Sequence, residues 1–115
     1  MGDFRKLLAW QEAKRFSLLS HKAIALLPAH ERYALGAQWR RAAYSVALNI
    51  AEGAGQPGRH QFKRYLTIAM GSLDELQAVL ELAEGLGYLE RQMVTELQLS
   101  RAHCARLVIG LRNSL

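Results

Sequence analysis

The chain has 115 residues, of which 50% are hydrophobic and 22% are charged, with a formal net charge of +5 at pH 7. This length allows one hydrophobic core but not two, and no stretch approaches the roughly 20 apolar residues that would exclude a soluble protein. Residues 1–6 lack the apolar run of a signal peptide, and the lone Cys104 cannot form an internal disulfide. We therefore expect one soluble, cytoplasmic domain over residues 1–115.

The charges are unevenly distributed along the chain. Residues 1–64 carry 11 basic against 4 acidic side chains, a net charge of +7, whereas residues 65–115 carry 4 against 6, a net charge of −2. Charge patterns of this kind govern association rather than fold. The asymmetry favours an anionic partner or a contact between acidic and basic surfaces of neighbouring subunits.

The first two predicted helices span residues 6–27 and 31–54. Pro28 ends the first, and the glycine- and proline-rich segment 53–58 ends the second, because neither residue type sustains a helix. Each helix carries one apolar stripe at helical spacing. The stripes are Ala9, Ala13, Phe16, Leu19, Ala23 and Leu27, then Leu35, Trp39, Ala42, Val46, Ile50 and Gly53.

The last two predicted helices, residues 59–86 and 90–113, have the more regular stripes, with an alternating spacing of four and three residues. Gly85 and Gly87 separate them, since glycine suits the end of a helix. No strand pattern is present, and short connections favour antiparallel neighbours. We predict an all-α, antiparallel up-down four-helix bundle. These stripes are Phe62, Leu66, Ala69, Leu73, Leu76, Leu80, Ala83 and Gly87, then Met93, Leu97, Ser100, Cys104, Leu107 and Leu111.

Motifs for catalysis, cofactors and metals are weak in this sequence. Gly53, Gly55 and Gly58 match G-x-G-x-x-G, but a helix stands where a dinucleotide site requires a strand. None of the four histidines follows a glutamate by three residues, the pattern of di-iron bundles. Ser45 and Ser72 lack a recognisable base. We therefore expect no enzyme activity, no cofactor and no metal.

Basic side chains form two groups that could contact phosphates. On the last helix they fall within one arc opposite the apolar stripe, whereas the other group converges only if the second and third helices fold back suitably. A solvated helix face is the alternative for both groups. The candidate nucleic-acid-binding residues are Arg91, Arg101, Arg106 and Arg112 on the last helix, with Arg40, Arg41, Arg59, Lys63 and Arg64 in the other group.

Apolar residues remain outside the four stripes and would leave wide apolar flanks on a monomer. A ring-closing contact between copies would bury such flanks repeatedly, with acidic residues of the third helix facing basic residues of the next subunit. We predict a ring-like homo-oligomer. Its candidate interface residues are Leu18, Tyr44, Leu48, Tyr65 and Val79.

Residues 38–53, QWRRAAYSVALNIAEG, and 62–76, FKRYLTIAMGSLDEL, carry a family resemblance. With the flanking residues they resemble the four-helix bundle proteins encoded by intervening sequences of bacterial 23S ribosomal RNA genes. The resemblance covers about three quarters of the chain and weakens along the last helix. In the connection at residues 55–58, the family's usual arginine and capping serine are missing, and Arg59 stands close enough to replace the arginine.

The resemblance implies a homopentamer arranged as a barrel. A similarity to the accessory variability determinant proteins of diversity-generating retroelements suggests binding to nucleic acid or to a reverse transcriptase. Our first hypothesis is a non-enzymatic, oligomeric nucleic-acid-binding protein with a slight preference for RNA. The alternative is an interaction scaffold, or an accessory subunit, that binds an acidic partner protein. An enzyme with a deep polar pocket is a distant third.

Overall fold

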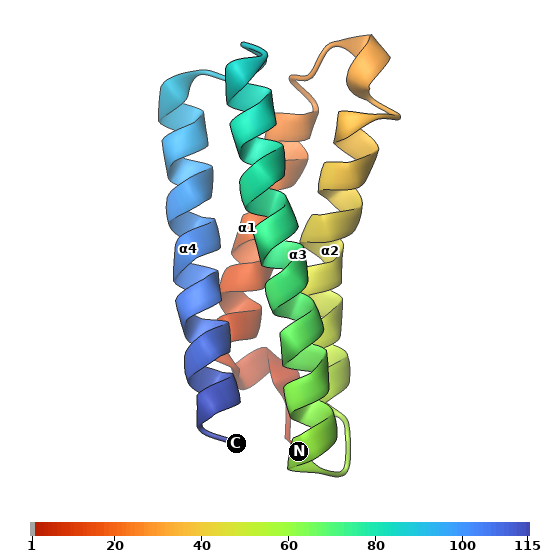
Figure 1. Cartoon of the computed structure of the whole chain (residues 1–115), viewed down its shortest axis with the longest axis vertical. Coiled ribbons are helices and arrows are strands. Elements are labelled where there is room, and N and C mark those ends of the chain that lie inside the picture. The colour runs from red at the N-terminus through yellow and green to blue at the C-terminus, as the bar shows by residue number, and fades with distance from the viewer. Residues whose placement is uncertain (1) are drawn as a thin grey trace.

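Four α-helices account for most of residues 2–115, the part of the chain that the computed structural model describes (Figure 1). Met1 lies outside the described residues. Two short 3-10 helices precede the first and second α-helices, and the described residues contain no strand. The elements are η1 (Phe4–Lys6), α1 (Leu8–Ile24), η2 (Ala29–Glu31), α2 (Leu35–Ala54), α3 (Arg59–Gly85) and α4 (Arg91–Asn113).

Each α-helix packs against two neighbours: α1 against α2, α2 against α3, α3 against α4, and α4 against α1. The first and last described residues and the connection at residues 55–58 lie at one end of the molecule, which we call the terminal end (Figure 1). Residues 25–34 and 86–90 lie at the opposite end, the distal end. The molecule measures 43 × 24 × 20 Å, so its long axis separates these two ends.

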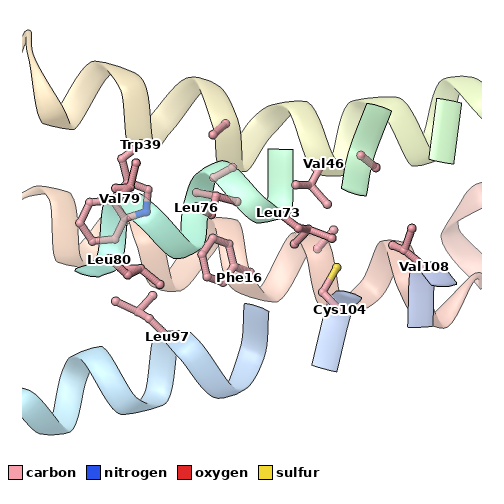
Figure 2. Close-up of a cluster of buried hydrophobic side chains, with 14 of the residues drawn as sticks. Phe16, Trp39, Val46, Leu73, Leu76, Val79, Leu80, Leu97, Cys104 and Val108 are labelled. Carbon is pink, nitrogen blue, oxygen red and sulfur yellow. The ribbon is translucent and has the colours of Figure 1, made fainter. Parts of the chain in front are cut away.

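The predicted stripes form the core (Figure 2). Trp39, Ile50, Leu66 and Leu80 are fully buried, and Phe16 is 1% exposed. Burying side chains of this size stabilises the fold by about 1.5–3 kcal/mol each. The sequence therefore predicted the all-α fold class and most of the interior correctly.

The buried face of α4 differs in detail from its predicted stripe. Val94 and Val108, which the stripe omitted, are buried, whereas Met93 and Leu107 are only partly buried. These positions are 14 residues apart, four turns of a helix. The prediction therefore found the correct side of α4 but misplaced its centre by one residue at both positions.

The helix ends differ from prediction where local hydrogen bonds intervene. The first predicted helix begins at Leu8 because residues 4–6 form η1, and it ends at Ile24 because Leu26 and Leu27 make 3-10 bonds to Ala23 and Ile24. The second begins at Leu35 rather than residue 31, since residues 29–31 form the separate η2. The third and fourth helices agree with prediction to within one residue.

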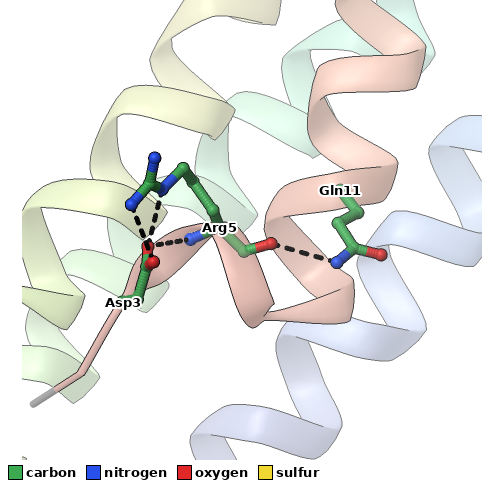
Figure 3. Close-up of polar contacts among 3 residues, drawn as sticks. All are labelled: Asp3, Arg5 and Gln11. Carbon is green, nitrogen blue, oxygen red and sulfur yellow. Dashed lines mark hydrogen bonds and ion pairs between the residues drawn. The ribbon is translucent and has the colours of Figure 1, made fainter.

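The two ends of the bundle are closed by specific contacts. At the terminal end, the Asp3 carboxylate accepts hydrogen bonds from the Arg5 backbone N–H (3.0 Å) and Nε (2.9 Å), and Gln11 donates to the Arg5 carbonyl at 3.0 Å (Figure 3). At the distal end, Gly87 has φ +74°, and its N–H and that of Tyr88 bond back to α3. Glycine adopts this conformation without strain, which confirms its predicted role at a helix end.

Candidate nucleic-acid interface

Basic side chains from three elements gather at the terminal end. They belong to η1, to the first two turns of α3 and to the last two turns of α4, all of which lie there in Figure 1. Among the described residues none of them makes an ion pair within the chain, whereas the neighbouring Arg5 is paired with Asp3 at 2.9 Å. We call the unpaired set the basic pole: Lys6, Arg59, Lys63, Arg64, Arg106 and Arg112.

The beginning of α3 adds a second source of positive potential to the basic pole. Gly58 occupies the N-cap position with extended backbone, φ −133° and ψ 156°, and offers no side-chain cap. The first backbone N–H groups of α3 therefore lack the partner that a serine would provide. A helix N-terminus favours anions, because its free N–H groups and its dipole both attract negative charge.

A groove lies between η1 and α4 within the basic pole. It has a volume of about 420 Å³, and Lys6 lies on one side of it and Arg106 on the other. Leu8 is 65% exposed and contributes to its floor. The acidic side chains at this end of the molecule include Asp3, which is paired with Arg5, and Glu52 in the last turn of α2. Glu12 and Glu96 line a separate hollow with Arg106. The basic pole thus keeps a clear excess of positive charge.

The structure separates Arg40 and Arg41 from the basic pole. The Ser45 and Ser72 hydroxyls bond to one another at 2.9 Å and fix how far α2 and α3 overlap. Arg59 precedes Ser72 by 13 residues, which corresponds to about 20 Å of helix, whereas Arg41 lies one turn beyond Ser45 in the opposite direction. The predicted convergence of these arginines with Arg59, Lys63 and Arg64 is therefore wrong.

The predicted basic arc of α4 is also divided. Arg101 is partly buried, where desolvation lowers its pKa and the charge of Asp74 on α3 opposes that shift. Its Nε donates to Gln98 Oε1 at 2.9 Å. Arg106 instead faces η1 and α1, and Arg91 begins α4 at the distal end. Only Arg106 and Arg112 of this arc join the basic pole.

The polar residues between α2 and α3 serve packing. Asn49 Nδ2 donates to the Ser45 carbonyl at 2.8 Å and to its hydroxyl at 3.0 Å, and Ser72 completes the network. Their hydrogen-bonding capacity is thus used within the seam, in contacts that join two helices. Within residues 2–115, no group of three or more His, Cys, Asp or Glu side chains is placed to hold a metal ion.

Of the five predicted apolar flank residues, three are exposed, one is partly buried and one is buried. Leu18, Tyr44 and Leu48 are 58%, 42% and 67% exposed, and Tyr65 is partly buried. Val79 is only 5% exposed, so its assignment to an uncovered flank is wrong: it packs inside the protomer beside Leu80. The prediction omitted other exposed apolar residues of the α-helices, although their positions off the stripes could have revealed them. These include Ile68, Leu82 and Leu99.

A model of the 23S rRNA-intervening sequence protein family matches residues 5–110. The chain belongs to this family. The fold is similar to that in a crystal structure of a protein of unknown function from the S23 ribosomal protein family of Bacteroides thetaiotaomicron. The two superpose with a TM-score of 0.85 at 20% sequence identity, over 91% of this chain and 98% of that protein.

A comparison of this chain with curated proteins found no match. Within residues 2–115, no helix combines the length with the apolar character that a membrane crossing requires. The family relationship therefore defines the fold, and the surface has to supply the argument for function.

Proposed function

We propose that this family member is a non-enzymatic, oligomeric nucleic-acid-binding protein that contacts the phosphate backbone, with RNA preferred to DNA. The observation that carries the proposal is the basic pole, where six cationic side chains without an ion-pair partner, from three elements, lie at the same end of the molecule as the uncapped beginning of α3. Long basic side chains and free backbone N–H groups are the groups that proteins use on phosphates.

The basic pole favours binding that depends on salt and only weakly on base sequence. Phosphate contacts position a protein on nucleic acid without reading the bases. Each phosphate neutralised by a lysine or arginine releases bound counterions, so affinity falls steeply as the salt concentration rises. No aromatic side chain belongs to the basic pole as defined, and stacking of bases is not part of the proposal.

We further propose that the protomer is an antiparallel up-down bundle that closes into a ring-like homo-oligomer of five subunits. Connections at alternate ends of the molecule support the bundle topology. A groove of about 240 Å³ on α1, lined by Lys14, Leu18 and Leu19 among others, supports the contact between copies. Its complement is the acidic set on α3: Asp74, Glu75, Glu81 and Glu84. Ring closure would repeat the basic pole and raise its affinity through multivalency.

Fluorescence anisotropy with labelled single- and double-stranded RNA and DNA, at several salt concentrations, tests the binding proposal. Combined replacement of Arg59, Lys63 and Arg64 by glutamine should weaken binding and reduce the salt slope by about 2 to 3, because one counterion is lost per phosphate contact. Arg91→Gln, which removes one exposed charge at the distal end of the molecule, outside the basic pole and the α1 groove, should change neither quantity appreciably.

Two results would overturn the binding proposal. One is the absence of binding to all four nucleic acids at low salt, together with recovery of one acidic partner protein after nuclease treatment, which would favour the scaffold alternative. The other is an equal loss of affinity in Arg91→Gln and in each single variant of the basic pole, since the contact would then be a general effect of net charge.

Multi-angle light scattering at micromolar concentration tests the assembly. We expect a mass of five chains for the wild type and a smaller species for Leu48→Glu, because a buried unpaired carboxylate opposes association. A stable monomeric mass for the wild type would defeat the ring and the multivalency argument. A matched change at exposed Gln61 should leave the mass unchanged.

A further inference from the structure

A pocket of about 230 Å³ lies at the distal end, between the end of α1, the segment after η2 and the second turn of α2. Its wall combines three basic and three aliphatic side chains. Because the basic pole is at the opposite end of a molecule 43 Å long, the two sites are independent. The lining residues are His21, Ile24, Ala25, Leu27, Arg32 and Arg40.

The walls of this pocket are held by packing and hydrogen bonds. Gly36 lets α2 approach closely, since a Cβ there would lie 3.1 Å from the Glu31 carbonyl oxygen and 3.5 Å from Ile24 Cγ2. Glu31 accepts a hydrogen bond from the Tyr88 hydroxyl at 2.7 Å and one from the Leu35 N–H at 3.4 Å. These contacts fix the segment that carries Arg32, and Arg40 is partly buried on α2.

The positive charges at the pocket are not used within the chain. Among the described residues, neither Arg32 nor Arg40 has an ion-pair partner. Glu31, the acid next to Arg32, is held by Tyr88 and Leu35, and its pKa is lowered by the Tyr88 hydrogen bond. Two guanidinium groups around one pocket repel each other, so an anion between them would be stabilised.

Compensation of the negative end of α1 is the simpler explanation for these cations. Three of the last four carbonyl groups of α1, however, already accept hydrogen bonds from backbone N–H groups: those of His21, Ala23 and Ile24. The end of the helix therefore needs little from the arginines. Both arginines line one pocket, which indicates a ligand rather than a helix cap.

We propose that this pocket binds a phosphate monoester. Arginine forms paired, charge-assisted hydrogen bonds with phosphate oxygens, and a monoester carries up to two negative charges to match two guanidinium groups. It also has a single substituent, so its phosphate can enter a recess, whereas a backbone phosphodiester is flanked by a sugar on both sides. Pockets for drug-sized ligands have about 300–1,000 Å³, so this smaller pocket suits a phosphate and part of the attached group.

A phosphate monoester could come from a free mononucleotide or from the 5′ end of a nucleic acid. Isothermal titration with adenosine 5′-monophosphate, inorganic phosphate and adenosine tests the shared chemistry. The monophosphate and phosphate should bind, and adenosine should not. RNA hexamers with and without a 5′-phosphate then distinguish the sources: a preference for the phosphorylated hexamer identifies the nucleic-acid end, and no preference identifies the free nucleotide.

Variants assign the binding to the pocket. Arg32→Gln and Arg40→Gln should each weaken monophosphate binding by about 10- to 100-fold, the effect of losing hydrogen bonds to a charged group. Lys22→Gln, equal in charge change and adjacent to His21 but absent from the lining, should bind as the wild type does. Tyr88→Phe should weaken binding a few fold by releasing Glu31. Because Arg32 is exposed, the Arg32→Gln variant should fold and tests the pocket even if the Arg40→Gln variant fails to fold.

Three results would overturn the proposal: no binding of the monophosphate or phosphate, equal binding of adenosine, or equal affinities of the Arg32→Gln and Lys22→Gln variants. Failure of the proposed nucleic-acid binding would give a result that differs from these three. In that case all RNA hexamers without a 5′-phosphate fail to bind at low salt, whereas the monophosphate still binds. The triple variant of Arg59, Lys63 and Arg64 should retain monophosphate binding.

Discussion

The seams between α2 and α3 and between α1 and α4 solve the same packing problem in different ways. In the first, Gly53 lets the helices approach so closely that a Cβ there would lie 2.8 Å from Tyr65 Cβ and 3.0 Å from Phe62 Cδ1. In the second, the carboxylate of Glu12 accepts a hydrogen bond from the Ser100 hydroxyl at 2.7 Å. One seam depends on the absence of a side chain, and the other depends on a paired charge.

The α1–α4 seam is the more polar of the two. Glu12 has a side chain only 11% exposed, and it also contacts Arg15 Nη1 at 3.1 Å and His103 Nδ1 at 3.4 Å. Cys104 Sγ donates to the Ala9 carbonyl at 3.7 Å in the same seam. Because buried polar groups are costly when they lose a partner, this seam should be sensitive to chemistry, whereas the α2–α3 seam should be sensitive to volume.

The largest expected effect is on the α2–α3 seam. Gly53→Leu should lower the free energy of unfolding by about 3 kcal/mol, because the added side chain must displace α3 or its aromatic residues. Urea denaturation with circular dichroism measures the change. Gly71→Ala is the control: nothing lies within 4 Å of its added Cβ, and the better helix former should stabilise α3 by up to about 1 kcal/mol. Similar effects of both changes would contradict the claim that the α2–α3 seam requires the absence of a side chain at Gly53.

The next effect concerns the partner of the buried carboxylate. Ser100→Ala should lower the free energy of unfolding by about 2 kcal/mol, since Glu12 loses its shortest hydrogen bond in a site with little access to water. Ser72→Ala, which removes a hydroxyl pair in the other seam, should cost about 0.5–1 kcal/mol because both groups are uncharged and partly exposed. An equal cost for the two serines would contradict the contrast between the seams.

A smaller effect should appear in the pH dependence of stability. Burial raises the pKa of Glu12, but the Ser100 hydrogen bond, Arg15 and His103 outweigh it, so the pKa lies below the ordinary value of 4.5. The ionised carboxylate therefore stabilises the fold fully above pH 4.5, and this contribution disappears as the pH falls through the lowered pKa.

Glu12→Gln should therefore unfold more easily than the wild type by about 1 kcal/mol at neutral pH, a modest value because Arg15 is 57% exposed. The difference should shrink steadily in urea denaturation curves taken below pH 4.5. A constant difference from pH 3 to pH 7 would show that amide packing, and not the charge, distinguishes the two proteins.

The sequence was sufficient to predict the interior because apolar residues at helical spacing have one way to be buried. Trp39, Leu66 and Leu73 were all identified from spacing alone, and all are at most 1% exposed. The prediction of Val79 failed because the buried face of a helix between two neighbours is wider than one stripe. The start of α2 was misplaced because η2 depends on local backbone bonds that apolar spacing does not record.

The candidate site was harder to predict, because surface charges obey no comparable constraint. Arg59, Lys63, Arg64 and Arg106 were identified as candidate residues, but Lys6 was not. It lies 100 residues from Arg106 along the chain, and the two line one groove only in the fold. Arg32 was not singled out at all. The Ser45–Ser72 hydrogen bond fixes how α2 is aligned along α3. This alignment determines which arginines of the two helices lie at the same end of the molecule.

The last prediction concerns the reactivity of the Cys104 thiol, which lies in the α1–α4 seam. Burial, reinforced by the nearby charge of Glu12 and opposed by that of Arg101, raises the pKa of its thiol to about 12. At pH 8 only about one thiol in ten thousand is then ionised, and the thiolate is the reactive form. In the native protein a disulfide reagent should therefore react far more slowly than in urea, with a rate that follows the population of opened molecules. Ser100→Ala should accelerate the reaction by about 30-fold, the equivalent of about 2 kcal/mol, whereas Ser72→Ala should accelerate it only about two- to fivefold. Rapid native labelling that is insensitive to both variants would show that the α1–α4 seam opens without unfolding and that the Glu12 pairing does not hold it closed.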